Sequence, residues 1–313
     1  MKKLIILVYL SFPLFLFSQE IQISETLLKK HIQYLSSDRM QGRQTGSKQV
    51  AKAGKYIEKY FKKMGLKPKG VDGYKQKFVA KVKKVVISDS LKSANNIIGF
   101  LDNGASKTIV IGAHYDHIGH GEFGNSKDEK ENIGKIHNGA DDNASGVAGL
   151  LELARYFSQN KIKEDCNILF IAFCGEELGL YGSKYFVENP TIPLGSIHWM
   201  LNMDMIGRYT PENKLGIIGY GTSPGFAKAF QGIHSDILYN LSKDGRGGSD
   251  QTSFYDKKIP VLFFHTYGHP DYHKHTDDWE KINFPAMVSI LNIEKDVVIA
   301  TMKIPEMEFV WTN

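Results

Sequence analysis

The sequence has few cysteines: Cys166 and Cys174 are the only two in 313 residues. They flank the apolar run Asn167 to Phe173, which is typical of a β-strand. An extended strand rises about 3.3 Å per residue, so the two α-carbons would lie roughly 26 Å apart. A disulfide requires α-carbons within about 7 Å of each other. The sequence therefore excludes a disulfide framework and predicts two free thiols.

No hydrophobic run reaches the about 20 residues that a membrane-spanning helix needs. The longest, Leu4 to Phe17, follows Met1-Lys2-Lys3, is interrupted by Pro13 and is followed by polar sequence from Ser18. This pattern predicts a signal peptide over residues 1–18 and an exported protein, periplasmic or secreted. No cysteine follows the run, so a lipid attachment point is missing and no membrane anchor is expected.

A strong excess of charge is also missing. The net charge is +5, and it falls to about +3 without Lys2 and Lys3, which argues against nucleic acid as a partner. The lysines between Lys75 and Lys84 alternate with apolar residues, as in a strand with one solvated face. No internal repeat or low-complexity tract is visible, and the remaining residues 19–313 fit a single domain.

Apolar periodicity predicts an α/β fold with three α/β/α layers and a mixed central sheet. A helical stripe covers 47–66, and a strand, helix and strand at 108–113, 145–157 and 168–173 form a crossover unit. The turn residues 102–104 predict a hairpin between a strand at 96–101 and the strand at 108–113. Further strands are predicted at 197–203, 215–218 and 261–264, and helices begin at Ser223-Pro224 and at Pro285. The polar stretch 120–138 is longer than an ordinary connection and predicts a loop at a functional rim.

Metal-binding side chains recur at the ends of the predicted strands. They are His114, the pair Asp141-Asp142 before a helix, the pair Glu176-Glu177, Asp204 and His273. Ligands of open α/β sheets bind beyond the carboxyl ends of strands, so these segments could converge. Imidazole and carboxylate together suit zinc. Adjacent side chains in extended chain point to opposite faces, so one residue of each pair can bind metal while the other stays free.

Five segments in this order resemble peptidase family twenty-eight, the di-zinc aminopeptidases related to aminopeptidase Y, glutamate carboxypeptidase and glutaminyl cyclase. The segments are Gly112 to His117, Gly139 to Gly146, Glu176-Glu177 with Gly179 and Gly182-Ser183, Asn202 to Met205, and Asp271 to His273. Arg39 to Arg43 with Gly46-Ser47 resembles the N-terminal segment of the family. The resemblance implies a zinc-exopeptidase fold that runs from about Gly42 to the last helix.

The resemblance also implies roles for individual residues. The ligands of two Zn²⁺ ions would be His114, Asp142, Glu177, Asp204 and His273, with Asp142 bridging the ions. Glu176 would be the general base for a metal-bridged hydroxide that attacks a peptide bond. Asp116 would orient His114, and Tyr272 would steady the oxyanion. Gln251 departs from the family, whose members often have histidine after Ser249-Asp250.

Several alternatives remain open at this point. Five more histidines lie in or near the motifs and are rival ligands: His117, His120, His137, His269 and His275. We prefer the interpretation that they lie at the rim of the site or contact the ligands without binding metal. The leading function is an aminopeptidase that acts on peptides. The alternatives are a single-zinc glutaminyl cyclase, a carboxypeptidase and a non-catalytic binding domain of the same fold.

Overall fold

The computed structural model describes residues 21–132 and 134–312, and the predicted signal peptide lies outside them. Within the described residues, nine strands form one mixed sheet in the order β1-β3-β5-β4-β6-β9-β7-β8, and β2 pairs with β3. The strands are β1 (Lys67–Pro68), β2 (Lys75–Lys81), β3 (Leu91–Leu101), β4 (Thr108–His114), β5 (Asn167–Phe173), β6 (Ile197–Met203), β7 (Leu215–Ile218), β8 (Tyr239–Ser242) and β9 (Val261–His265).

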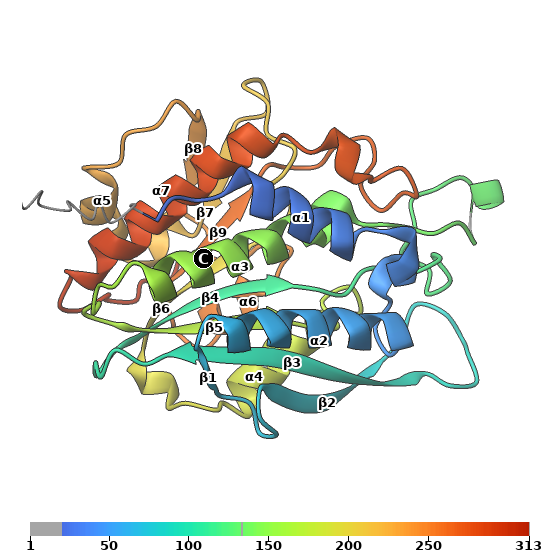
Figure 1. Cartoon of the computed structure of the whole chain (residues 1–313), viewed down its shortest axis with the longest axis horizontal. Coiled ribbons are helices and arrows are strands. Elements are labelled where there is room, and N and C mark those ends of the chain that lie inside the picture. Colours follow the sequence, from blue (N-terminus) through green and yellow to red (C-terminus); the bar gives the residue numbers. More distant parts are fainter. Residues whose placement is uncertain (1–20, 133, 313) are drawn as a thin grey trace, which may run out of the picture.

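Helices cover both faces of this sheet (Figure 1). One face carries α1 (Glu25–Leu35), α2 (Lys48–Lys63), α3 (Gly146–Gln159) and α7 (Phe284–Met302), with α5 (Pro224–Phe230) against α7. The other face carries α4 (Tyr181–Glu188) and α6 (Gln251–Tyr255). Two separate groups of buried apolar side chains fill the two interfaces. The predicted three-layer α/β/α architecture is confirmed.

Short helices connect these elements. They are η1 (Asp38–Arg43), η2 (Lys130–Asn132), η4 (Leu194–Ser196), η5 (Tyr220–Thr222) and η6 (Trp279–Lys281), together with the π-type turn η3 (Ala140–Ser145) that leads into α3. Both cysteines are free and buried, which confirms that interpretation of the sequence.

The predicted crossover unit is confirmed, because β4 and β5 are parallel neighbours joined through α3. The predicted hairpin is wrong. β3 pairs with β2 and β5, both antiparallel, and β5 separates it from β4. The chain does bend at Gly104, whose φ is 70°. However, β4 is buried along its whole length, and a strand buried on both faces takes a place inside the sheet with a neighbour on each side.

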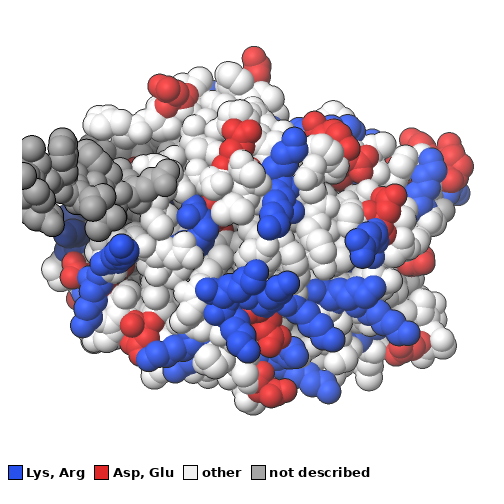
Figure 2. Space-filling view, in the orientation of Figure 1, with Lys and Arg blue, Asp and Glu red and all other residues white. Residues whose placement is uncertain are grey.

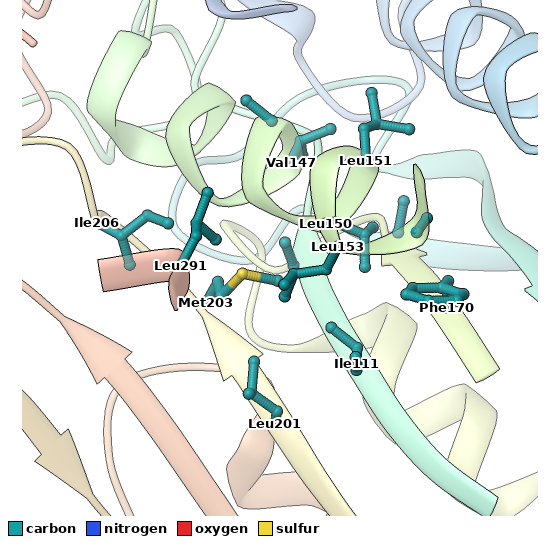
Figure 3. Close-up of a cluster of buried hydrophobic side chains, with 14 of the residues drawn as sticks. Ile111, Val147, Leu150, Leu151, Leu153, Phe170, Leu201, Met203, Ile206 and Leu291 are labelled. Atoms are coloured by element: carbon teal, nitrogen blue, oxygen red, sulfur yellow. The ribbon is translucent and has the colours of Figure 1, made fainter. Parts of the chain in front are cut away.

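Helix α3 lies across the centre of the sheet and is buried over most of its length. Leu150 and Leu153 point down toward Ile111 of β4 and Leu201 of β6, and Leu291 of α7 closes the cluster (Figure 3). Truncating one such side chain to alanine costs about 2–5 kcal/mol. This packing holds η3, at the start of α3, against the ends of β4 and β6.

Lysines gather on the face that α2 presents to solvent (Figure 2). Lys48, Lys52, Lys55 and Lys59 are exposed at helical spacing, while Ile57 and Phe61 on the opposite side are buried. Burial alternates along β2 as well, which confirms a strand with one solvated face. None of the helices in the described residues is long and apolar enough to cross a membrane.

Candidate metal centre

The four central strands β5, β4, β6 and β9 run parallel, so their carboxyl ends share one edge of the sheet. All five predicted ligands lie at that edge. His114 ends β4, Asp142 lies in η3, Glu177 follows β5, Asp204 follows β6 and His273 lies in the loop after β9. The tertiary structure therefore brings together side chains that are separated by up to 159 residues in the sequence.

Two groups of side chains share Asp142. In the first, Nε2 of His114 lies 3.4 Å from Oδ1 of Asp142 and 3.2 Å from Oδ1 of Asp204. In the second, Nε2 of His273 lies 3.1 Å from Oδ2 of Asp142 and 3.2 Å from Oε2 of Glu177. The two oxygens of Asp142 thus face different groups, as a carboxylate that bridges two ions requires.

These distances fit zinc. A tetrahedral ion with ligands at about 2.0–2.2 Å holds those ligands roughly 3.3–3.6 Å apart. The hydrogen bonds of the imidazoles agree, because Nδ1 of His114 lies 3.1 Å from the Asp116 carbonyl and Nδ1 of His273 lies 2.7 Å from the Asn125 carbonyl. A proton on each Nδ1 leaves Nε2 free for a metal. In addition, Oδ1 of Asp204 is buried without a hydrogen-bond donor.

His117 is the strongest rival among the other histidines. Its Nδ1 lies 3.0 Å from Oε1 of Glu177 but 3.8 Å from Oδ2 of Asp142, and its Nε2 is buried without a partner. It forms a possible three-residue metal group with those two carboxylates. His273 is closer to Asp142 than His117 is, so we favour His273 as the third ligand of the second group.

The remaining histidines have partners outside the two groups. Nε2 of His269 lies 3.2 Å from Oδ2 of Asp141, and Nδ1 of His275 donates to Oδ2 of Asp128 at 2.9 Å. His137 lies 2.9 Å from Ser126 Oγ, and His120 lies 2.9 Å from the Gly134 carbonyl. His120 and His137 therefore stabilise the loop that contains them, and the Asn125 carbonyl in this loop lies 2.7 Å from Nδ1 of His273. This position agrees with the prediction that the loop lies at the rim of the site.

Asp116 contacts His114 differently from the prediction. Its carboxylate is 3.8 Å from Nδ1 of His114, and the backbone carbonyl makes the shorter contact instead. The carboxylate accepts hydrogen bonds from Oγ1 of Thr45, at 2.6 Å, and from the backbone N–H of Glu176, at 3.3 Å. Asp116 thus joins the β4 end to the Glu176-Glu177 turn.

Asp277 supports the backbone of the turn that carries Asp142, and the sequence does not predict this role. Its carboxylate accepts from the backbone N–H groups of Asp141 and Asp142, which lie 136 and 135 residues away in the chain. Asp141 accepts from the Gly207 N–H at 2.7 Å with Oδ1 and therefore points away from the ligand groups. Only the fold could reveal this pairing, because Asp277 belongs to none of the motifs. Gln251, where the sequence departs from the family pattern, is also buried. Its Oε1 accepts a hydrogen bond from Nδ2 of buried Asn202.

The two neighbouring glutamates differ in their surroundings. Burial raises the pKa of Glu176 well above its usual range, and the charge of Glu177 adds to the effect. Burial acts in the same direction on Glu177, but the charges and hydrogen bonds of His273 and His117 hold its pKa well below its usual range. Burial disfavours the charged form of His273, yet Glu177 and Asp142 raise its pKa to about 11. The carboxylates are thus stabilised by nearby positive charge, which protonated His273 supplies here. A bound metal ion would supply this charge in place of the proton.

A pocket of about 410 Å³ opens beside the predicted ligands. Asp142, Asp204 and His273 contribute to its wall, and so do Glu176 and Tyr272. The Tyr272 ring lies 4.0 Å from the His273 ring. Two residues with predicted catalytic roles therefore line the same pocket as three of the predicted ligands.

Arg43 is fully buried behind this site. Its guanidinium donates to the backbone carbonyls of Tyr115, Asn138 and Gly139, and also to that of Leu35. Burial lowers its pKa to about 10, against the charges of Asp142, Asp277, Asp116 and Glu177. Arg43 thus links the N-terminal segment to the segments that carry His114 and Asp142, and its charge offsets part of the carboxylate excess.

Replacing Arg43 by alanine is expected to lower the free energy of unfolding by about 3–5 kcal/mol, because several buried carbonyls lose their donor and the carboxylates lose a buried counter-charge. Urea denaturation followed by circular dichroism measures the change. Exposed Arg39, four residues earlier, provides the control, and Arg39→Ala should stay within about 0.5 kcal/mol of the parent. Equal stability of the two variants would contradict the structural role of Arg43.

The sequence is similar to those of known metallopeptidases. The model of peptidase family M28 matches residues 96–298. A probable leucine aminopeptidase of Arthroderma otae is 28% identical over 264 residues, which cover 80% of this chain and 63% of that protein. The chain spans less than two thirds of the length of the curated relatives it matches.

Solved structures share the fold. A Zn-dependent exopeptidase from Parabacteroides distasonis superposes with a TM-score of 0.71 at 18% identity, over 89% of this chain and 98% of that one. The glutaminyl cyclase of Bacteroides thetaiotaomicron superposes with a TM-score of 0.70 at 19% identity, with the same coverage. At these identities the likeness concerns the fold alone.

Proposed function

Because this chain belongs to peptidase family M28, we propose that it is an exported, zinc-dependent aminopeptidase that removes N-terminal residues from peptides. The observation that carries the proposal is the pair of ligand groups that share Asp142 beside a pocket lined by Glu176. The probable leucine aminopeptidase of Arthroderma otae supports the aminopeptidase activity. Export rests on residues 1–18, and the mass of exported protein tests it, with a loss of about 18 residues expected.

The roles of the chain's residues follow from their positions. His114, Asp142 and Asp204 would hold one zinc ion, and Asp142, Glu177 and His273 the other. When bound, zinc supplies Lewis acidity that polarises a carbonyl group and makes water a stronger nucleophile. The carboxylate of Glu176 then accepts the proton of the attacking water and returns it to the leaving amine.

Tyr272 would act on the carbonyl oxygen of the substrate. Its side chain lines the pocket next to His273, and burial raises its pKa beyond its usual range, with the charges of Asp142 and Glu177 adding to the effect. The hydroxyl therefore keeps its proton at neutral pH. A protonated phenol can donate a hydrogen bond to the oxyanion that forms during hydrolysis.

A glutaminyl cyclase is the second candidate, favoured by the structural likeness to the enzyme of Bacteroides thetaiotaomicron. A cyclase of this fold would hold a single zinc, whereas the two groups that share Asp142 support two ions. A carboxypeptidase would use the same metal chemistry on the other end of a peptide. A non-catalytic binding domain is disfavoured because Glu176 lines the pocket together with the ligands.

Zinc-loaded protein is expected to contain two zinc ions per chain and to release N-terminal residues from aminoacyl substrates. Elemental analysis measures the zinc content. Activity is measured with aminoacyl substrates, carboxypeptidase substrates and peptides with an N-terminal glutamine. His273→Gln should lose one ion, while His117→Gln, the matched control, should keep two. A plateau at one zinc with cyclisation of N-terminal glutamine would instead assign the chain to the cyclases.

A further inference from the structure

One lysine stands in a pocket whose other charged groups are carboxylates and imidazoles. Lys127 lines the pocket together with Asp142, Glu176 and Asp204. Among the residues that the structure describes, Lys127 takes part in no ion pair. Its side chain is exposed to solvent and therefore accessible to a ligand that enters the pocket.

A stack of side chains separates this ammonium group from the ligand carboxylates. Nζ of Lys127 lies 3.9 Å from the centre of the Tyr272 ring. That ring lies 4.0 Å from the His273 ring, whose Nε2 is 3.1 Å from Asp142. The pocket thus has negative charge at one end and a positive charge on the far side of the Tyr272 ring.

The backbone fixes Lys127 relative to the metal centre. The Lys127 N–H donates to the His273 carbonyl at 2.9 Å, and the Asn125 carbonyl lies 2.7 Å from Nδ1 of His273. The Asp128 carboxylate accepts the backbone N–H of His275 at 2.8 Å. Lys127 and two of its neighbours are therefore tied to the segment that carries a proposed ligand, so the base of this side chain does not move independently of the site.

We propose that Lys127 binds the terminal carboxylate of short peptides, so that the enzyme prefers di- and tripeptides with both termini free. The inference rests on the proposed aminopeptidase function. The free amine of the substrate meets the carboxylate end of the pocket, and its carboxylate meets Lys127. An ammonium group has three donors, so it can bind a carboxylate while it lies over an aromatic ring.

The spacing matches a short peptide. Nζ of Lys127 lies at most about 8 Å from the His273 ring, because it is 3.9 Å from the Tyr272 ring and the two rings are 4.0 Å apart. Successive α-carbons of an extended chain lie about 3.8 Å apart, so this distance corresponds to about two residues. A longer peptide carries its terminal carboxylate beyond the reach of Lys127. The apolar wall formed by Met205, Ile218 and Phe263 suits an apolar N-terminal side chain, which makes leucine the residue to use in test substrates.

The experiment compares kcat/KM for Leu-Gly and Leu-Gly-Gly with kcat/KM for the same peptides as C-terminal amides, on zinc-loaded enzyme. The free acids are expected to be better substrates by about tenfold, the effect of one charge-assisted hydrogen bond. Lys127→Met should bring the ratio close to one, and Lys127→Arg should restore most of it. Lys130→Met, in the same segment but outside the pocket wall, is the matched control and should keep the parent ratio.

Leu-Asp amide carries a carboxylate on its side chain and none at its terminus. It therefore distinguishes binding of a terminal carboxylate from binding of a side-chain carboxylate. Calorimetric binding of Leu-Gly and its amide to zinc-loaded Glu176→Gln protein, with and without Lys127→Met, gives a readout without turnover. A ratio near one in the parent enzyme, or an equal loss in Lys127→Met and Lys130→Met, would overturn the inference. Failure of the parent enzyme to hydrolyse any peptide would overturn the proposed function, and calorimetry would still decide the role of Lys127.

Discussion

Replacing Glu176 by glutamine is expected to lower kcat by at least the about 10²-fold typical of the loss of a general base, while the protein keeps its zinc. The side chain keeps its size, so the pocket keeps its shape, but the amide cannot accept the proton of the attacking water. No ion pair joins Glu176 to the histidines among the described residues, whereas both oxygens of Glu177 lie near them. Steady-state kinetics and zinc analysis of the same preparation measure both effects.

Glu177→Gln is the matched neighbour for this comparison. A neutral amide is a poorer ligand for zinc, and His273 and His117 lose the charge that they face, so zinc content should fall. If Glu176→Gln lost zinc while Glu177→Gln retained it, the two roles would be exchanged. If both variants kept full activity, the proposed site would be wrong.

Asp142→Asn is expected to weaken both zinc sites and to abolish measurable activity. Its two carboxylate oxygens face His114 and His273 separately, so one substitution removes a charge that both groups share. The loss of zinc affinity should exceed the about 10–100-fold that changes in outer-shell partners cost. Titration with a competing zinc chelator measures both affinities.

Asp141→Asn provides the control for Asp142. Asp141 is equally buried and adjacent in sequence, but its Oδ1 accepts the Gly207 N–H, which an asparagine oxygen can still accept. Asp141→Asn should therefore retain both zinc ions. Loss of zinc from Asp141→Asn with retention in Asp142→Asn would show that the bridging residue was assigned to the wrong neighbour.

Much of the fold could be predicted because the strands are short, apolar and separated by clear turns. The strand at 197–203 was predicted with its observed bounds, and the last helix begins within one residue of Pro285. The pairing of β3 with β5 rather than with β4 could not be predicted. Turn residues indicate where the chain bends, but they do not show which strand lies next to β3 in the sheet. The order of strands depends on how the helices cover the two faces.

The sequence by itself determined which residue types could hold metal and that they follow the ends of strands, because strand periodicity and motif order are local properties of the chain. The tertiary structure alone decided how they group. It turned the two oxygens of Asp142 toward different histidines, joined Asp277 to the η3 turn and buried Arg43 behind the site. These contacts join segments up to 136 residues apart. Hydrogen bonding in a buried site depends on the side chains that meet there, which no local pattern encodes.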